Sequence, residues 1–467
     1  MRIEKDFLGE KQVPEHAYWG IHTQRALENF PLSGHPVHSN LIKALALVKV
    51  SAAQANMELG YLDNDTGYAI IEAGSEIAAG KLADQFPTDA LQGGAGTSTN
   101  MNVNEVIANR ATELLGGGKG QYLVDPLNHV NMHQSTNDVY PTALRIAAIK
   151  MLLPLSEQIA ELQDVLQQKE AEFAGILKPG RTQLQDAVPV TLGQEFSGWA
   201  QAVARDRWRI YKVEERLRQV NLGGTAAGTG INAPREYIFL VIEKLRQNTG
   251  IGLARAESLI DVTQNADVFT EVSGLLKAAA VNLNKIANDL RLLSSGPFAG
   301  FAEIRLPEKQ AGSTIMPGKV NPIIPEAVNQ VAFQVIAADL AITMACQNGQ
   351  LEINQFLPLV TYNLLQAIDL LGKGASILAY KCVSGITVNE ERCLELVEHS
   401  LITAPILMPV LGYAKTAEVV KYARREKVTV RQAVKDLGYL SSEDAEKVLD
   451  YHLMARPGSA DKPLREE

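Results

Sequence analysis

The sequence predicts an all-α protein. Hydrophobic residues recur every three or four positions over several long segments, and short Gly- and Pro-containing breaks separate these segments. That spacing places apolar side chains on one face of a helix, whereas a half-buried strand needs strict alternation, which is rare here. We therefore expect no sheet of any size, and short strands only in the N-terminal region or in the Gly-rich breaks.

The clearest helical segment runs from Val268 to Leu293. Its apolar steps alternate between three and four residues over about seven turns, against roughly three turns for an average globular helix. A heptad-like stripe of this length needs partner helices along its whole length. We expect five long helices in series and a long central bundle. The stripe consists of Val268, Val272, Leu275, Ala279, Leu283, Ile286, Leu290 and Leu293. The other four segments span residues 141–173, 192–220, 322–346 and 357–382.

The pattern changes on both sides of this bundle, which predicts three domains. Residues 1–137 mix shorter helices with Gly-rich and Pro-containing loops, and residues 138–391 hold the long helices. Residues 392–467 form short helices that end in a Pro- and charge-rich tail. A stripe as long as that of residues 268–293 is fully buried only if helices of other subunits also cover it. We therefore expect a homo-oligomer with a helical bundle at its core.

Charge and composition exclude several functional classes. The formal net charge is −9, with no long run of Lys and Arg, so neither a nucleic acid nor an anionic membrane is an expected partner. Residues 1–6, MRIEKD, lack the apolar segment of a signal peptide, and no uninterrupted apolar stretch reaches membrane-spanning length. The scattered Cys346, Cys382 and Cys393 fit reduced thiols rather than zinc or iron–sulfur ligands. We expect a cytoplasmic protein.

Two polar segments lie at the starts of predicted helices. Residues 93–100, GGAGTSTN, lead into a helix expected over 101–115, and a Gly-rich approach of this kind leaves backbone N–H groups free to bind a carboxylate or phosphate. Residues 134–138, QSTND, come before the helix expected to start near Pro141. For both segments the alternative is plain N-capping. The first lacks the spacing of a Walker loop or a dinucleotide fingerprint.

Two further segments are rich in hydrogen-bond donors and turn residues. Residues 180–186, GRTQLQD, follow a turn, and the alternative to a ligand site is a buried pair of Arg181 and Asp186 that organises the loop. Residues 312–322, GSTIMPGKVNP, lie between two long helices. Two glycines and two prolines in this span predict an ordered, hinge-capable loop that closes over a substrate. A simple helix connection is the alternative.

Residues 312–322 resemble the signature loop of the aspartase/fumarase superfamily, G-S-x-x-M-P-x-K-x-N. Residues 2–9, RIEKDFLG, and the segments around Thr97, Ser135 and Thr182 are similar to family segments in the same order, so the resemblance covers essentially the whole chain. It implies the three-domain fold of that family with its long central five-helix bundle. It also implies a homotetramer with a twenty-helix core, in which three subunits contribute to each active site.

The resemblance further implies a role for each matched residue. Ser313 is the base that removes a proton from the carbon beside a carboxylate. Neutral donors and helix N-termini around that carboxylate serve as an oxyanion hole for the doubly charged aci-carboxylate intermediate. These donors are Thr97, Ser135, Thr136 and Thr314. Thr182, Lys319 and Asn321 bind the other carboxylate of the substrate, and Asn137 and Gln183 lie near its amino group. No cofactor is implied, although divalent cations activate some members.

Two departures from the fumarases favour ammonia as the leaving group. Fumarases usually have His directly after the Gly-Arg-Thr of the third segment, where this chain has Gln183, and a different run after the Asn-Pro of the loop, where it has residues 323–326, IIPE. Expelling hydroxide from malate requires a general acid, whereas an ammonium group leaves as neutral ammonia. Gln183 cannot titrate but can accept a hydrogen bond from ammonium. We therefore expect a carbon–nitrogen lyase that reversibly deaminates L-aspartate to fumarate.

Other readings stay open at this point. The chain could be a class II fumarase or a lyase of a substituted aspartate, because one small change in the pocket redirects the elimination. It could also be a catalytically inactive structural member, against which the intact Ser313, Lys319 and Asn321 argue. Phe298 stands where the family commonly has Arg. His129 and His133 have metal-ligand-like spacing but are expected to cap or pack beside the Ser135 segment.

Overall fold

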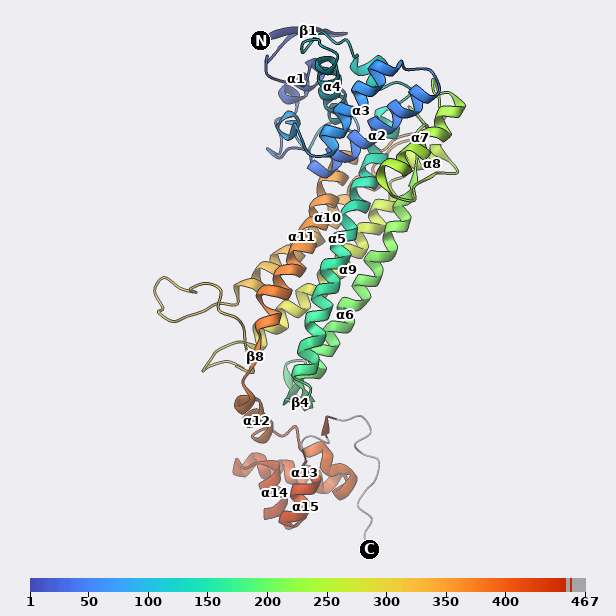
Figure 1. The fold of residues 1–467 in the computed structure, drawn as a ribbon. Helices are drawn as coiled ribbons and strands as arrows, with labels where there is room; N and C mark the ends of the chain where they lie inside the picture. The colour runs from blue at the N-terminus through green and yellow to red at the C-terminus, as the bar shows by residue number, and fades with distance from the viewer. Residues whose placement is uncertain (451–453, 456–467) are drawn as a thin grey trace. The chain divides into compact units, whose positions relative to one another are not determined.

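The computed structural model describes residues 1–450, 454 and 455, and helices dominate it (Figure 1). The strands in this part of the chain form four two-stranded sheets and no larger one. The all-α prediction is therefore confirmed, including the expectation that short strands lie near the N-terminus and in Gly-rich breaks. The Pro- and charge-rich tail of the predicted C-terminal domain lies outside the described residues from 456 onward.

The five long predicted helices are present. They are α5 (Thr136–Glu172), α6 (Leu192–Val213), α9 (Asp267–Leu293), α10 (Ile323–Gln347) and α11 (Leu357–Lys381). The prediction was wrong at the end of α6, where residues 214–218 form a 3-10 helix, η3 (Glu214–Arg218), and residues 219–220 form β5 (Gln219–Val220). Leu217 and Val220 are buried there, so their apolar spacing reflects burial in a short helix and a strand.

The chain divides into two compact units, each built from three stretches of sequence. Unit 1 consists of residues 1–157, 208–280 and 333–372. Unit 2 consists of residues 158–207, 281–332 and 373–467. Each of the five long helices supplies residues to both units.

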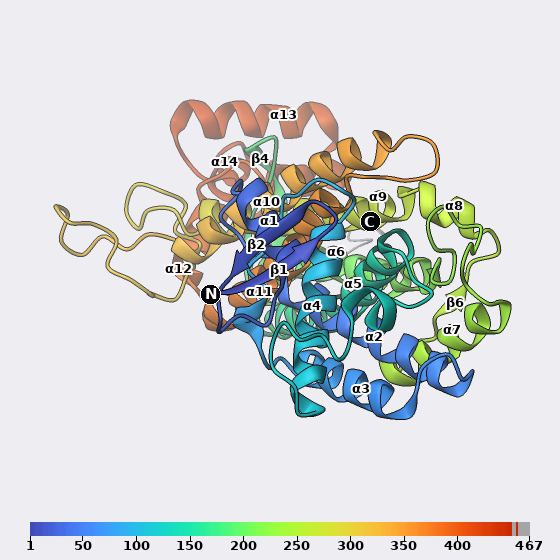
Figure 2. The same cartoon turned by 90° about the horizontal axis from the view of Figure 1, so that it is seen from above.

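Unit 1 begins with a hairpin of β1 (Arg2–Asp6) and β2 (Gly9–Val13), which lie side by side in Figure 2 and contact α1 (Ile21–Asn29). Helix α2 (Ser39–Glu58) packs against α3 (Asn64–Ala78) and α7 (Arg235–Thr249), and α3 packs against α4 (Thr97–Leu114). Strand β5 pairs in parallel with β6 (Ala254–Arg255). The remaining short helices are η1 (Ala83–Gln85), the π-helix η2 (Pro126–Val130) and α8 (Leu259–Gln264).

Unit 2 contains a second hairpin, β3 (Leu177–Thr182) and β4 (Gln185–Thr191), so the predicted break at residues 178–180 is part of a strand. Helix α12 (Glu390–Glu398) packs against β3. Strand β7 (Ile304–Arg305), which directly precedes the loop that contains Ser313, pairs antiparallel with β8 (Thr387–Val388). Between α11 and α13 lie η4 (Val383–Gly385) and η5 (Ala404–Leu407), and the helices α13 (Met408–Glu426), α14 (Val430–Asp436) and α15 (Ser442–Val448) follow.

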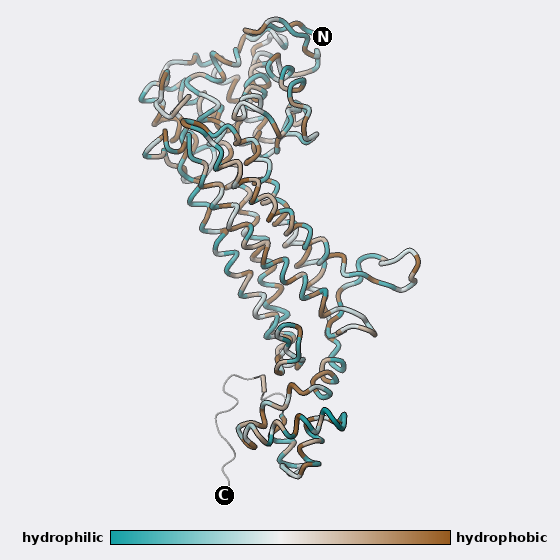
Figure 3. Tube along the Cα trace, turned by 180° about the vertical axis from the view of Figure 1, so that it is seen from behind, coloured by the Kyte–Doolittle hydropathy of each residue, from teal (hydrophilic) through white to brown (hydrophobic). Residues whose placement is uncertain are grey.

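Apolar and polar residues are interspersed along the long helices (Figure 3), as expected for helices with one apolar face. Most of the predicted stripe of α9 is buried, while Val268 and Leu275 are half-buried. The buried members are Val272, Ala279, Leu283, Ile286, Leu290 and Leu293. The heptad-like pattern therefore identified the side of α9 that packs in the bundle.

Helix α10 is long and apolar enough to cross a membrane by length and composition, alone among the described helices. Glu326, Asp339 and several amide side chains interrupt its apolar residues, so the expectation that no uninterrupted apolar stretch reaches that length is not contradicted. Core helices of soluble proteins have the same composition. Asp339 of α10 is buried, accepts a hydrogen bond from Ser273 of α9 and pairs with Lys277 at 2.6 Å. We therefore assign α10 to the bundle.

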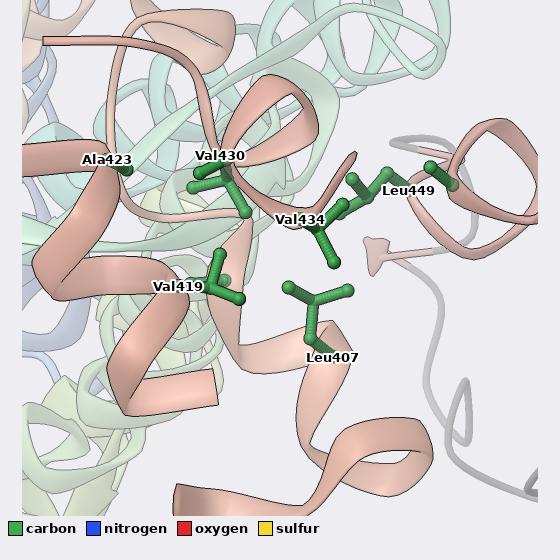
Figure 4. Packing of buried hydrophobic residues seen from close by; sticks show 9 residues of the cluster. Leu407, Val419, Ala423, Val430, Val434 and Leu449 are labelled. Carbon is green, nitrogen blue, oxygen red and sulfur yellow. The ribbon is translucent and has the colours of Figure 1, made fainter. Parts of the chain in front are cut away.

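The end of the chain has a small core of its own. Figure 4 shows buried side chains of α13, α14 and the segments on either side converging on one cluster. Its members are Ala404, Leu407, Val419, Ala423, Val430, Ala433, Val434, Ala445 and Leu449. Because a small core buries little apolar surface in total, each buried member contributes a large share of its stability.

We expect Leu407→Ala to destabilise this cluster by about 2–5 kcal/mol, because the substitution leaves a cavity at a fully buried site. Hydrogen exchange of the amides of α13 and α14 should accelerate accordingly. Leu394→Ala is the matched control, since Leu394 of α12 is 45% exposed. Equal exchange in the two variants would contradict this packing.

Candidate active site

The Thr97 segment forms the start of α4. Gly96 precedes the helix with φ of 94° and no side chain caps the first turn, so the N-capping alternative is wrong for Thr97. Thr97 is the first helical residue, is exposed, and donates its hydroxyl to the carbonyl of Gly94 at 2.8 Å. A Cβ on Gly96 would lie 2.3 Å from the ring of Tyr140, so only glycine allows α4 to approach α5 here.

The Ser135 segment caps α5. The Ser135 hydroxyl accepts the N–H of Asn137 at 3.2 Å, and Asp138 accepts the N–H of Ser135 at 3.0 Å. This reciprocal arrangement is a capping box with Asp in place of Glu. The capping alternative is therefore confirmed for Ser135. Helix α5 starts at Thr136 rather than near Pro141, since the cap lies five residues earlier than the proline suggested.

A hydrogen bond joins α4 to the start of α5. Asn100 lies three residues after Thr97, on the same side of α4, and donates to the hydroxyl oxygen of the buried Thr136 at 3.1 Å. Because that oxygen already accepts, the hydrogen of Thr136 is left to donate to a ligand. Asn100 thus ties the first turn of α4 to Thr136, whose hydroxyl hydrogen is suited to a carboxylate.

The side-chain oxygen of Asn131 supports the contact between α4 and the start of α5. It accepts hydrogen bonds from Asn100 at 3.2 Å, from Asn104 at 3.1 Å and from the ammonium of Lys49 at 2.9 Å. Lys49 also donates to Gln134 at 2.9 Å. Three donors on one amide oxygen fix its position, and through Asn100 they fix the hydroxyl of Thr136.

Two ionisable groups beneath the junction are fully buried. Burial lowers the pKa of the Lys49 ammonium to about 7, against the attraction of Asp138. Burial raises the pKa of the Asp138 carboxyl to about 6, although three backbone N–H groups, those of Ser135, Gly223 and Thr225, donate to it. A positive charge in this low-dielectric region favours a carboxylate nearby.

Asn137 is held by the segment after β5. Pro141 has no N–H, so the carbonyl of Asn137 lacks its helical partner, and Asn221 donates to it at 3.0 Å instead. The side chain of Asn137 donates to the carbonyl of Ala226 at 2.7 Å. Residues 221–226 therefore fix both the backbone and the amide group of Asn137.

Thr182 and Gln183 lie exposed at the tip of the β3–β4 hairpin in unit 2. Thr182 pairs with Gln185, and the two residues between them have left-handed backbones, with φ of 55° at Gln183 and 62° at Leu184. A two-residue turn of this type normally uses Asn and Gly. The expected loop-organising pair is also different, because Arg181 pairs with Glu303 at 2.7 Å rather than with Asp186.

The Ser313 loop is ordered by its own hydrogen bonds. The hydroxyl oxygen of Ser313 accepts the N–H groups of Ile315 at 3.2 Å and Met316 at 2.9 Å. Asn321 donates to the carbonyl of Gly312 at 2.6 Å, and the N–H of Gly312 donates to the carbonyl of Lys319 at 2.8 Å. These two bonds close the neck of the loop and leave Thr314 and Lys319 exposed.

Several residues that organise these segments were not identified from the sequence. They are Lys49, Asn100, Asn131 and Asp138 in unit 1, and Glu303 in unit 2. One signal was available for Lys49, because it is the only charged residue between Ala44 and Met57 on a strongly apolar helix. The others show no spacing that sets them apart from ordinary polar residues.

The two histidines pack as expected. His133 hydrogen-bonds to Asn56 at 2.8 Å and contacts the rings of Tyr61 and Tyr237, and burial lowers its pKa. His129 accepts the N–H of Asp125 at 3.0 Å. No group of three or more His, Cys, Asp and Glu side chains that could hold a metal ion occurs among residues 1–450, 454 and 455.

Two family models match the sequence of this chain. A family model described as lyase matches residues 9–337, and a second model, described as fumarase C C-terminus, matches residues 401–456. The chain belongs to the aspartase/fumarase superfamily. The family resemblance drawn from residues 312–322 is thereby confirmed.

Individual superfamily relatives are similar over nearly their whole length. An aspartate ammonia-lyase of Bacillus sp is 49% identical over 461 residues, which are 98% of each chain. The structure of a Brucella melitensis fumarate lyase:delta crystallin bound to cobalt is 48% identical with a TM-score of 0.95, covering 98% of this chain and 100% of that one. A class II fumarase of Schistosoma mansoni is 34% identical with a TM-score of 0.94, covering 98% and 99%.

We expect the buried Lys49 to make stability depend on pH. The unfolded chain keeps its proton up to about pH 10.5, whereas the folded protein releases it near pH 7. Between these values the unfolded state binds more protons, so the free energy of unfolding contributed by this group rises with pH. Denaturant titrations from pH 7 to 10 should show this rise in the wild type and a flatter profile in Lys49→Met.

The matched control is Lys43→Met, which removes a partly exposed lysine from the same helix and should keep the wild-type profile. Identical profiles for the wild type and Lys49→Met would show that folding does not lower the pKa of Lys49.

Proposed function

We propose that this chain is an aspartate ammonia-lyase that reversibly converts L-aspartate to fumarate and ammonia. The observation that carries the proposal is its 49% identity, over 98% of both chains, to an aspartate ammonia-lyase of Bacillus sp. Gln183 at the tip of the β3–β4 hairpin supports it, because an amide cannot supply the proton that malate needs to lose hydroxide. A class II fumarase or a lyase of a substituted aspartate is the alternative.

In this proposal Thr97, Ser135, Thr136 and Thr314 bind the carboxylate beside the carbon that loses its proton. The buried Asn100 and Asn131 support Thr136, whose hydroxyl hydrogen is left to donate. The start of α5 adds the positive end of a helix dipole. As charge moves onto this carboxylate in the aci-carboxylate intermediate, these donors strengthen, and one such donor is commonly worth about 3 kcal/mol.

Ser313 is the proposed base. An alkoxide is costly at neutral pH, but two backbone N–H groups already donate to the Ser313 oxygen and favour its charged form. Ser313 takes the proton from the carbon beside the carboxylate, the electron pair moves onto that carboxylate, and ammonia then leaves from the neighbouring carbon. Lys319 lies on the same loop and adds a positive charge when the loop closes over the substrate.

Thr182, Lys319 and Asn321 bind the second carboxylate, and Asn137 and Gln183 hold the amino group. Asn321 already uses one amide hydrogen to close the neck of the loop, which leaves its second hydrogen for the substrate. The reaction balances with these groups alone, so no organic cofactor is needed. Cobalt in the Brucella melitensis structure makes a divalent cation a useful addition to the assays.

We also propose a cytoplasmic homotetramer in which three subunits supply each active site. Helix α10 leaves large apolar side chains exposed, with Phe333 57%, Leu340 63% and Met344 55% accessible, and helices of other subunits would cover them. Each subunit of this proposed assembly would have the three predicted domains, residues 1–137, 138–391 and 392–467. The mass of the protein in solution tests the assembly, and a stable, active monomer would refute it.

The decisive experiment measures fumarate release from L-aspartate by ultraviolet absorbance, with malate and substituted aspartates as parallel substrates and with or without Mg²⁺ or Co²⁺. We expect turnover with aspartate and little with malate. Turnover with malate alone would identify a fumarase. No turnover with any dicarboxylate would favour a catalytically inactive structural member.

We expect Ser313→Ala to lower kcat by about a hundredfold or more, because general-base catalysis contributes at least that much. The Michaelis constant for aspartate should change little, since the substrate keeps its other contacts. Ser442→Ala, an exposed serine of α15, is the control. A near-normal kcat in Ser313→Ala would exclude Ser313 as the base.

A further inference from the structure

A cluster of four charged side chains in unit 2 has no part in the proposed chemistry. Glu303 is fully buried, and its two oxygens lie 2.7 Å from Arg181 and 3.2 Å from Lys178. Lys178, itself 1% exposed, also pairs with Glu195 at 2.7 Å. Neither oxygen of Glu303 has a partner with the angles of an aligned hydrogen bond, so charge attraction is the main force that holds the cluster.

This cluster joins two segments that carry proposed site residues. Arg181 directly precedes Thr182 and Gln183 at the tip of the β3–β4 hairpin. Glu303 directly precedes β7, after which the chain enters the Ser313 loop. The ion pair between Arg181 and Glu303 is therefore a shared anchor for the hairpin tip and for the stem of the loop.

Both ends of the anchor are fixed by further contacts. The backbone of Glu303 donates to the carbonyl of Leu293 at 3.0 Å and accepts from the N–H of Asn389 at 2.9 Å. The guanidinium of Arg181 lies 4.1 Å from the centre of the Phe301 ring, which adds a cation–π contact. The charges of the pair thus sit on rigid parts of the fold.

The hairpin needs such an anchor because its turn is strained. Gln183 and Leu184 both have left-handed backbones, which residues with a Cβ rarely adopt. A strained backbone persists only where the surrounding structure holds it, and such positions gather at functional sites. Leu184 is 65% exposed and cannot hold the turn by packing, so the constraint comes from the base of the hairpin.

We propose that Arg181 and Glu303 are positioning residues, whose buried ion pair holds the Gln183–Leu184 turn and the stem of the Ser313 loop in the geometry that the reaction needs. This inference rests on the proposed function. It assigns no contact with substrate to either residue. Losing the pair should displace Thr182 and Gln183, and a displacement of about 1 Å can lower activity about a hundredfold.

The first test is Glu303→Gln, which keeps the size of the side chain and removes its charge. We expect kcat/KM for aspartate to fall about a hundredfold, with much of the loss in KM because Thr182 and Gln183 would bind substrate. The melting temperature should fall too, since Arg181 and Lys178 lose a buried partner. Glu214→Gln, which breaks the Glu214–Arg218 pair of 2.7 Å in unit 1, is the matched control and should keep wild-type kinetics.

The second test separates positioning from stability. Replacing both partners of a buried pair by apolar residues often restores stability, so Arg181→Met with Glu303→Leu should bring the melting temperature back toward the wild type, while Lys178 keeps Glu195. If the pair positions the site, kcat/KM stays low. Recovery of activity together with the melting temperature would overturn the proposal, because the pair would then be structural only.

A third readout does not depend on activity. Amide hydrogen exchange at residues 182–185 should accelerate in the double variant, because the strained turn loses its anchor. If the wild type does not act on aspartate, the proposed function is wrong, whereas unchanged exchange in the double variant refutes the positioning role by itself.

Discussion

The carboxylate of Asp138 is the contact on which the unit 1 part of the site depends. It accepts the N–H of Ser135 and thereby completes the cap of α5, and it accepts the N–H groups of Gly223 and Thr225. A buried anion with three backbone donors holds two distant stretches of chain in one place. The position of the Thr136 hydroxyl, and through Asn100 the start of α4, follows from this contact.

In unit 2 the proposed site residues lie near a buried ion-pair cluster instead of a helix cap. There the proposed site residues Thr182 and Gln183 lie on an exposed turn rather than at a capped helix, and the buried cluster of Glu303, Arg181 and Lys178 lies at the base of that hairpin. In both units a buried charge lies beside the neutral groups of the proposed site. In the proposed reaction, serine, threonine and asparagine side chains would then act as donors with little reorganisation.

The sequence was sufficient where the signal is local and periodic. The long helices and most of the buried stripe of α9 could be predicted because a spacing of three and four residues directly reflects one helix face. The motif of residues 312–322 identified the family for the same reason, since its residues are contiguous. The capping alternative holds for Ser135, whereas Thr97 is not a cap because Gly96 takes that place. Partners distant in sequence, such as Glu303 for Arg181, have no such signal.

Pro141 has one more consequence, for the order in which the protein folds. Because the proline cannot satisfy the carbonyl of Asn137, the first turn of α5 is completed only when Asn221, far along the chain, has docked against it. Contacts of such large sequence separation form late, after loop-closure entropy has been overcome. A partly folded chain with an intact α5 would therefore still lack an ordered Asn137, so the start of α5 takes its final form only in the finished unit.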